Sequence, residues 1–209
     1  MSSKRLLIVA LVVVGGFTAG AFAQKNELEL GVGRTFVSDQ GVVGSNLFNN
    51  DVHHGRAWTF GGTYGRLLRP GFTRLTFEVP VMYAPDVDLN YAANEVPSSY
   101  KALFAAPSLR ANIFGENAFS PWVSIGGGVA HFSPSSSLEF GGSSAAKGNT
   151  TGVLQVGLGL EVRLKAKWSL RGGMRDFWSG TPNINVNTGK SRQHNYVVGA
   201  GVVYRFGKF

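Results

Sequence analysis

Residues 196–209 read YVVGAGVVYRFGKF and have the pattern of a single extended strand. Side chains on a strand alternate between its two faces with a period of two residues. One face of this stretch is apolar, and it carries Tyr196, Val198, Ala200, Val202, Tyr204 and Phe206. The other face is small or polar, with Asn195, Gly199, Gly201 and Arg205. The chain therefore ends in a predicted strand that has one apolar side.

The aromatic residues of this face lie at its two ends, with Tyr196 at one end and Tyr204 and Phe206 at the other. A tilted strand needs about 9–11 residues to cross the hydrocarbon core of a membrane, and aromatic residues gather at both interfaces. The spacing thus indicates a membrane-spanning β-strand. Gly207 and Lys208 do not fit the alternation, so we expect a bulge or a short tail there.

The composition favours an all-β membrane protein over an ordinary soluble enzyme. The 209 residues include 29 glycines and 15 phenylalanines, whereas only 15% are charged. The mean hydropathy is close to zero, which is expected because barrel strands expose only half of their residues to lipid. The sequence contains no cysteine, which excludes disulfides and thiol chemistry.

Residues 1–23 have the pattern of a cleaved secretory signal, which leaves residues 24–209 as one mature domain. Lys4 and Arg5 precede an apolar run over residues 6–14, and Ala21-Phe22-Ala23 forms an A-x-A cleavage site. The apolar run is shorter than the about 20 residues that a membrane helix needs. Removing Lys4 and Arg5 from 20 basic residues leaves 18 against 12 acidic residues, a mature charge of +6.

Eight alternating segments follow the signal, joined in turn by long and short connections. They cover residues 27–37, 56–67, 72–84, 102–115, 121–132, 151–164, 168–178 and 196–209. Pro80 lies inside the third segment, where we expect a bulge or a locally open ladder. The plan predicts an all-β fold, an eight-stranded antiparallel up-and-down transmembrane β-barrel. A soluble lipocalin-type barrel is the alternative, but charged residues are too sparse to cover its outside.

An outward apolar face sends the charged strand residues into the lumen, and these are Glu29, Glu78, Arg110, Glu161, Arg163, Arg171 and Arg175. An eight-stranded barrel is only just wide enough for its own side chains. We therefore expect carboxylate–guanidinium networks that plug the interior, with a narrow ion path as the alternative. The expected interfacial aromatics are Trp58, Tyr83, Trp122, Trp168, Trp178, Tyr196, Tyr204 and Phe206.

Residues 24–209 resemble the small bacterial outer-membrane β-barrels of the OmpA-domain, OmpX and opacity-porin kind. The last predicted strand of this chain resembles the C-terminal strand that the barrel-assembly machinery recognises in that family. The resemblance implies a multi-pass barrel in the bacterial outer membrane, with its long loops at the cell surface. It also implies a monomer whose partners are membrane lipid and lipopolysaccharide, and the basic mature charge suits the phosphates of lipopolysaccharide.

The sequence offers little support for catalysis. Some small barrels resemble lipid A deacylases, which carry a His-x-Ser pair on the seventh strand, where this chain has Met174 and Asp176. His131-Phe132-Ser133 with Glu139 has similar elements on a different strand and its loop. A nucleophile, its base and an orienting group must meet in space, so we expect no enzymatic activity and no cofactor.

Metal and nucleic-acid binding are also disfavoured. Asp51, His53 and His54 in the first long loop could bind a metal, but adjacent histidines in an extended segment point in opposite directions. The arginines are scattered rather than gathered into one basic patch, so we expect no nucleic-acid partner. A structural or surface-interaction role is expected, with a narrow channel as the alternative and a lipid A-modifying enzyme as the least favoured possibility.

Overall fold

The computed structural model describes residues 26–45 and 50–207, so the predicted signal at residues 1–23 lies outside the described residues. The described chain is all-β. Its strands are β1 (Asn26–Val37), β2 (Gln40–Gly41), β3 (Asp51–His54), β4 (Ala57–Arg69), β5 (Thr73–Asn90), β6 (Ser99–Ala105), β7 (Ser108–Ile113), β8 (Phe119–Pro134), β9 (Asn149–Arg163), β10 (Trp168–Gly180) and β11 (Arg192–Phe206).

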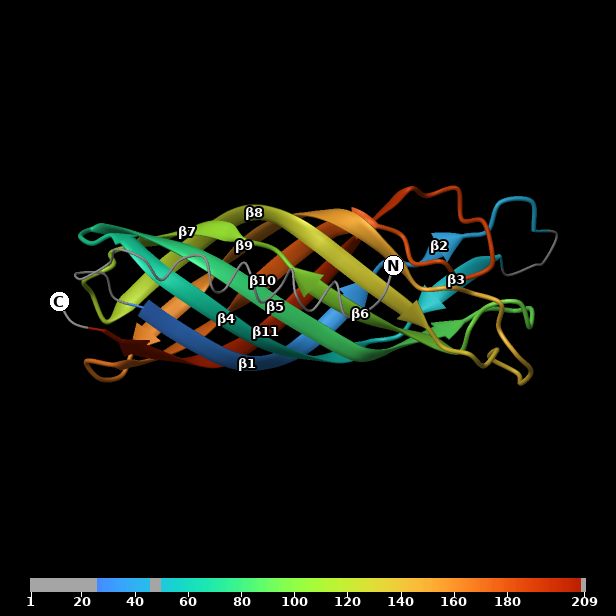
Figure 1. The fold of residues 1–209 in the computed structure, drawn as a ribbon, viewed down its shortest axis with the longest axis horizontal. Coiled ribbons are helices and arrows are strands. Elements are labelled where there is room, and N and C mark those ends of the chain that lie inside the picture. Colours follow the sequence, from blue (N-terminus) through green and yellow to red (C-terminus); the bar gives the residue numbers. More distant parts are fainter. Residues whose placement is uncertain (1–25, 46–49, 208–209) are drawn as a thin grey trace.

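The strands form a closed barrel whose wall has eight positions (Figure 1). One position is shared by β6 and β7, because both strands pair with β5 on one side and with β8 on the other. The ring closes where β1 pairs antiparallel with β11, from Asn26 opposite Phe206 to Val37 opposite Asn195. The predicted eight-stranded antiparallel barrel is confirmed. The hairpin of β2 and β3 lies outside the wall, in the first long loop.

Glycines allow the closing strands to approach each other. A Cβ atom on Gly33 would lie 2.4 Å from the carbonyl oxygen of Val198 and 2.9 Å from the Cα atom of Gly199. Gly199 meets the backbone of β1 in the same way. The small face of the last strand, which the sequence shows as Gly199 and Gly201, thus lies against the glycines of the first strand.

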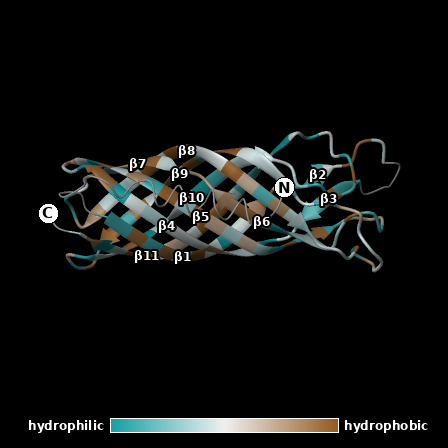
Figure 2. Ribbon diagram, viewed as in Figure 1, coloured by the Kyte–Doolittle hydropathy of each residue, from teal (hydrophilic) through white to brown (hydrophobic). Residues whose placement is uncertain are grey.

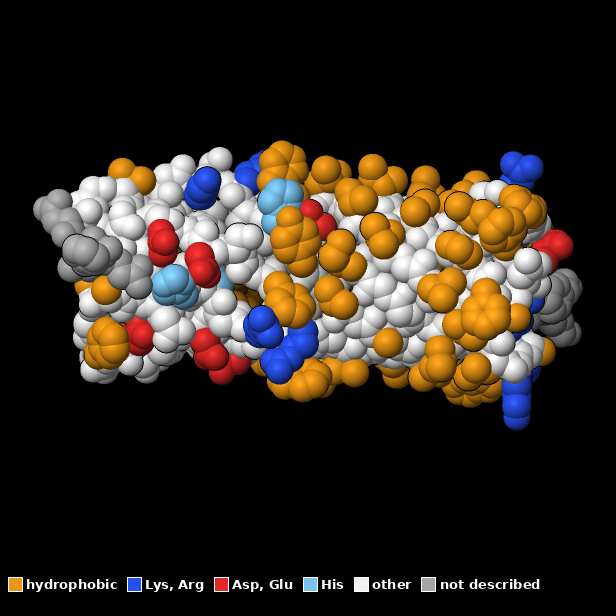
Figure 3. Space-filling view, turned by 180° about the vertical axis from the view of Figure 1, so that it is seen from behind, with side chains coloured by type: hydrophobic (Ala, Val, Ile, Leu, Met, Phe, Trp, Pro, Cys, Tyr) orange, Lys and Arg blue, Asp and Glu red, His pale blue; other side chains and the backbone are white. Residues whose placement is uncertain are grey.

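Hydrophilic and hydrophobic residues alternate along the wall strands (Figure 2), and burial separates them into an inside and an outside. Leu30, Phe60 and Ile125 are 65%, 55% and 60% exposed on the outer face, whereas Glu78, Arg110 and Gln155 are fully buried. Figure 3 shows hydrophobic side chains over the barrel wall and more charged side chains toward the end with the long loops. This orientation, apolar outside and polar inside, is the reverse of a soluble barrel.

The structure corrects the predicted extent of the second long loop. We expected a loop over residues 85–101, but β5 continues to Asn90 and β6 begins at Ser99. The register shifts between Ala84 and Val87, so a bulge accommodates Pro85 and the strand continues. The β5–β6 pair therefore projects farther toward the long-loop end than the sequence pattern indicated.

The predicted open ladder at Pro80 is present. The expected fourth strand is divided into β6 and β7 at Ala106 and Pro107, beside Pro80. Neither proline has an N–H group to donate to a ladder. The amide of Ala106 still donates to the carbonyl of Pro80 at 3.2 Å, and the amide of Gly127 donates to that of Pro107 at 3.1 Å.

At the C-terminal end, β11 stops at Phe206 and Gly207 has a φ of 102°. This change of direction agrees with the predicted departure from the strand at Gly207, while Lys208 lies outside the described residues. In residues 26–45 and 50–207, no helix has both the length and the apolar character to cross a membrane.

Candidate functional site

A network of charged side chains lies in the short-turn half of the lumen. It contains four glutamates and five arginines from inward positions of the wall strands, and these are Glu27, Glu29, Glu78, Glu161, Arg74, Arg110, Arg171, Arg175 and Arg205. Each acid lies on a strand different from those of its arginine partners. The network therefore joins opposite parts of the wall across the lumen.

Glu161 is the centre of this network. Its carboxylate accepts hydrogen bonds from Arg171 at 2.7 Å and from Arg74 at 3.0 Å. Arg110 reaches it at 3.3 Å, and Arg205 also binds it. A buried carboxylate is stable only when such partners replace water. Four guanidinium groups from β5, β7, β10 and β11 provide that replacement here.

The remaining carboxylates are paired as well. Glu78 lies 2.8 Å from both Arg110 and Arg175. Glu29 lies 2.7 Å from Arg171. Glu27 lies 2.8 Å from Arg171 and also binds Arg110. Because the arginines bridge between acids, these pairs form one connected cluster.

Six of the seven predicted lumen residues belong to this network, whereas Arg163 lies at the short-turn mouth of the lumen and makes no ion pair with the network acids. Arg163 is the last residue of β9, and it donates to the carbonyls of Gly115 at 2.8 Å and Glu116 at 3.1 Å in the neighbouring turn. The sequence reasoning missed Glu27, Arg74 and Arg205. Strand alternation could have found them, because they share faces with Glu29, Glu78 and Gly201 respectively.

Apolar side chains pack together in the long-loop half of the lumen, which the sequence reasoning had not predicted. Phe104 stacks on Phe177 with ring centroids 4.8 Å apart, and Phe132 meets Phe104 edge-on at 6.0 Å. Tyr100 packs against Phe132 at 5.8 Å. All four rings are at most 1% exposed. We call these four residues the aromatic plug.

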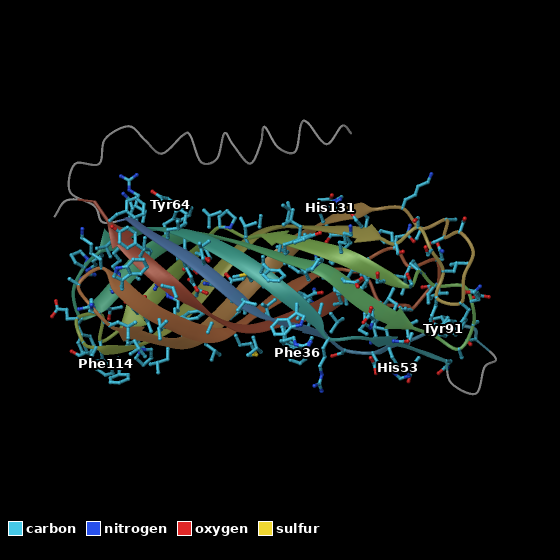
Figure 4. The ribbon with its side chains drawn as sticks, turned by 90° about the horizontal axis from the view of Figure 1, so that it is seen from below. Phe36, His53, Tyr64, Tyr91, Phe114 and His131 are labelled. Atoms are coloured by element: carbon cyan, nitrogen blue, oxygen red, sulfur yellow. The ribbon has the colours of Figure 1, made fainter. Side chains whose placement is uncertain are left out.

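The long loops cover the aromatic plug and bind one another. Tyr91 donates from its hydroxyl to Ser45 at 3.0 Å and from its amide to Glu139 at 2.8 Å. The side chain of Asn185 donates to the carbonyl of Glu95 at 3.2 Å. These bonds join the described loop residues 38–45, 50–56, 91–98, 135–148 and 181–191, which we call the loop cap. Figure 4 shows Tyr91 and His53 at this end of the molecule.

The expected interfacial aromatics lie near the two rims, with one exception. Trp58 and Trp178 are 56% and 40% exposed near the long-loop rim, and Trp168 and Phe206 are 45% and 39% exposed near the other. The prediction for Trp122 is wrong, because it is only 3% exposed. Trp122 lies on the same face as the inward Ser124, and the Arg175 guanidinium lies 5.0 Å above its ring. Tyr83 is 39% exposed and Tyr204 stacks on Phe206, as outward residues do.

Of the residues that suggested catalysis, His131 and Ser133 lie together, but Glu139 lies apart from them. Ser133 Oγ lies 3.2 Å from His131 Nε2, and His131 Nδ1 lies 2.8 Å from the hydroxyl of Thr150. Glu139 does not complete the group, because its carboxylate accepts the amide of Tyr91 in the loop cap. On the seventh wall strand, Asp176 lies 2.6 Å from His194 Nδ1.

The two adjacent histidines of the first loop occupy different environments. The His53 ring lies 2.7 Å from the carboxylate of Asp39, and this hydrogen bond raises the pKa of His53. The His54 ring turns inward, and neither of its buried nitrogens has a partner among the described residues. Burial lowers the pKa of His54 from 6.5 to about 4. Within residues 26–45 and 50–207, no group of three or more His, Cys, Asp or Glu side chains could hold a metal ion.

We expect Glu161→Gln to destabilise the barrel, because it removes the shared partner of four guanidinium groups. Breaking a buried pair typically costs about 3–5 kcal/mol. Urea unfolding in detergent micelles, followed by tryptophan fluorescence, would measure the loss. Glu116→Gln is the matched control, since Glu116 is exposed in a turn. Equal stability of the two variants would contradict the central role of Glu161.

The environment of His54 predicts that the loop cap loosens in acid. A folded-state pKa below the unfolded value means that stability is complete above pH 6.5 and declines as the pH falls toward 4. The full shift corresponds to about 3 kcal/mol. The pKa of His53 is shifted in the opposite direction, so its pair with Asp39 opposes this loss. Amide hydrogen exchange in the loops should therefore accelerate between pH 6.5 and 4, and His54→Gln should remove most of that dependence.

Comparisons with known proteins support the fold. No protein-family model matches the sequence, and no curated protein matches it. Among solved structures, the barrel is similar to Neisserial surface protein A, at 15% identity, TM-score 0.53, and coverage of 88% of this chain and 97% of that one. It is also similar to the outer-membrane protein OprG from Pseudomonas aeruginosa, at 14% identity, TM-score 0.54, and coverage of 90% and 98%.

A third structure, of the outer-membrane protein AlkL in lipid bilayers, is 18% identical with a TM-score of 0.50, and the match covers 91% of this chain and 94% of that one. These identities are low, so the likeness concerns the fold. The closed ring of strands and the apolar outer surface agree with this likeness. The chain has the fold of the small bacterial outer-membrane β-barrels, with an outer surface suited to a lipid bilayer.

Proposed function

We propose that this protein is an integral, non-enzymatic barrel of the bacterial outer membrane, with a closed lumen and a structural or surface-interaction role. The observation that carries the proposal is the filling of the lumen in two successive parts. The charged network occupies the short-turn half, and the aromatic plug occupies the long-loop half beneath the loop cap. The parts of the molecule that remain available to partners are the loop cap and the rims.

Two features of the lumen support the closed state over a narrow channel. The arginines of the network are held by several acids at once, so an ion would have to displace them from paired carboxylates. Beside the network lies a cavity of about 50 Å³, bordered by Arg171, Arg175 and Trp122. A water needs about 10–15 Å³ by this kind of measure, so the cavity has room for only a few waters.

The loop cap supports a surface-interaction role. Hydrogen bonds between different loops, such as that from the amide of Val43 to the carbonyl of Asn187 at 2.8 Å, hold the loops in a defined arrangement. Val52, Leu89 and Ile184 pack apolar side chains beneath it. A surface held in this way can present fixed groups to a partner at little entropic cost.

The long-loop rim supports lipopolysaccharide as a partner. Arg34 lies over the ring of Trp58 at 4.5 Å, Arg192 lies over Trp178 at 5.0 Å, and Arg56 lies over Phe36 at 5.6 Å. Aromatic residues at a membrane interface hold their neighbours at the level of the lipid headgroups. These contacts support a position of the three guanidinium groups at the level of lipid phosphates on the cell-surface side.

We expect the folded protein to show no steady conductance in planar lipid bilayers, because no open path crosses the two fillings of the lumen. Single-channel recording under symmetric salt is the measurement, with an established porin as the positive control. A steady current that changes in Glu78→Ala or Arg110→Ala would contradict the closed lumen and favour the channel.

We also expect the triple variant Arg34→Gln, Arg56→Gln, Arg192→Gln to bind lipopolysaccharide roughly 100-fold more weakly, at about 1 kcal/mol per basic residue. Titration of purified lipopolysaccharide into the micellar protein would measure the affinity. The pair Lys165→Gln and Lys167→Gln, in a turn at the other end, is the control. If both sets of substitutions leave binding unchanged, the rim does not hold the phosphates.

A further inference from the structure

The short-turn end of the lumen opens into a cavity of about 500 Å³, which we call the vestibule. Its charged lining residues are Glu27, Arg74, Glu116, Arg163 and Arg205. In outer-membrane barrels the short turns face the periplasm. The vestibule is therefore the part of the lumen that periplasmic solutes reach.

Two guanidinium groups in the vestibule converge on one atom. Arg74 Nη1 and Arg163 Nη2 both donate to the carbonyl oxygen of Gly115, at 3.5 Å and 2.8 Å. The two side chains come from β5 and from the end of β9. Because they share this acceptor, the two groups are close enough for one small anion to contact both.

These arginines also keep unused capacity for hydrogen bonds. Arg74 is only 7% exposed, and its buried Nε has no hydrogen-bond partner in the described part of the chain. Arg163 donates to two carbonyl oxygens, and no described carboxylate lies within ion-pair distance of it. A buried donor without a partner is costly, so Arg74 favours an added acceptor, and the unpaired positive charge of Arg163 favours an anion beside it.

Arginines outnumber glutamates in the network and the vestibule, which also favours an added anion. Arg163 and the five network arginines make six guanidinium groups, against the four network glutamates. Glu116 is exposed at the edge of the vestibule and reduces the excess from two positive charges to one. Part of the excess lies at the mouth, because Arg163 lines the vestibule and donates to backbone carbonyls rather than to a described carboxylate.

We propose that the vestibule is an anion site that binds a phosphate group between Arg74 and Arg163. A phosphate has several acceptor oxygens and matches the forked donors of guanidinium groups better than a monatomic anion does. The volume exceeds that of inorganic phosphate by a wide margin, so the site also has room for a phosphate ester. Free periplasmic phosphate and the headgroup of a phospholipid in the inner leaflet share this chemistry.

Calorimetric titration of inorganic phosphate into the mature protein in maltoside micelles, at constant ionic strength set with chloride, tests the proposal. We expect saturable binding that becomes at least tenfold weaker in Arg163→Gln. Lys165→Gln is the matched control, because it removes the same charge from the same end at a residue that does not line the vestibule. Arg163→Lys should recover only part of the affinity, since a lysine keeps the charge and loses the fork.

Slower gel migration only after boiling would show that each variant still forms the closed barrel, so a loss of binding could not be attributed to unfolding. Adding phosphatidylglycerol to the micelles distinguishes the two sources, because competition with phosphate assigns the site to a lipid headgroup and no competition assigns it to a free anion. The proposal is overturned if phosphate gives no saturable signal, or if folded Arg163→Gln binds as tightly as the native protein.

Discussion

The structure depends on the requirement that every backbone N–H and C=O group in lipid finds a partner within the protein. A sheet meets this requirement only when it has no edge, so the first wall strand must pair with the last. The β1–β11 ladder, with Gly33 and Gly199 in close contact across it, provides that closure. Once eight strand positions close into a ring, the width of the lumen is set, and it is only large enough for side chains.

The narrow lumen in turn explains why its two halves differ. Toward the short turns, charged residues face inward and can be stable only as a connected cluster, which Glu161 and its four arginines illustrate. Toward the long loops, Phe104, Phe132 and Phe177 pack as the core of a soluble domain would, because the loop cap excludes water above them. The lumen thus holds the charged network toward the short turns and the aromatic plug toward the long loops.

The excess of arginine over glutamate at the mouth links this interior to the solution outside. Arg74 and Arg163 lie where the wall ends, and both line the vestibule and donate to the carbonyl of Gly115. At the opposite rim, Arg34 and Arg192 are held against tryptophans at the level of the outer interface. Both ends of the barrel therefore display guanidinium groups suited to phosphate, whereas the lipid-facing wall between them is apolar.

The sequence alone determined the closed barrel, its outward apolar face and most of its inward charges, because alternation with a period of two is a local property that each strand carries by itself. The same rule, applied to Ser124 and Glu29, would have placed Trp122 and Glu27 inside. Only the tertiary structure decided which charges meet across the lumen, that Arg163 binds a turn instead of the network, and that four aromatic rings close the long-loop half. These contacts join residues up to 144 positions apart in the chain. They follow from the stagger of the strands around the ring, which no single segment encodes.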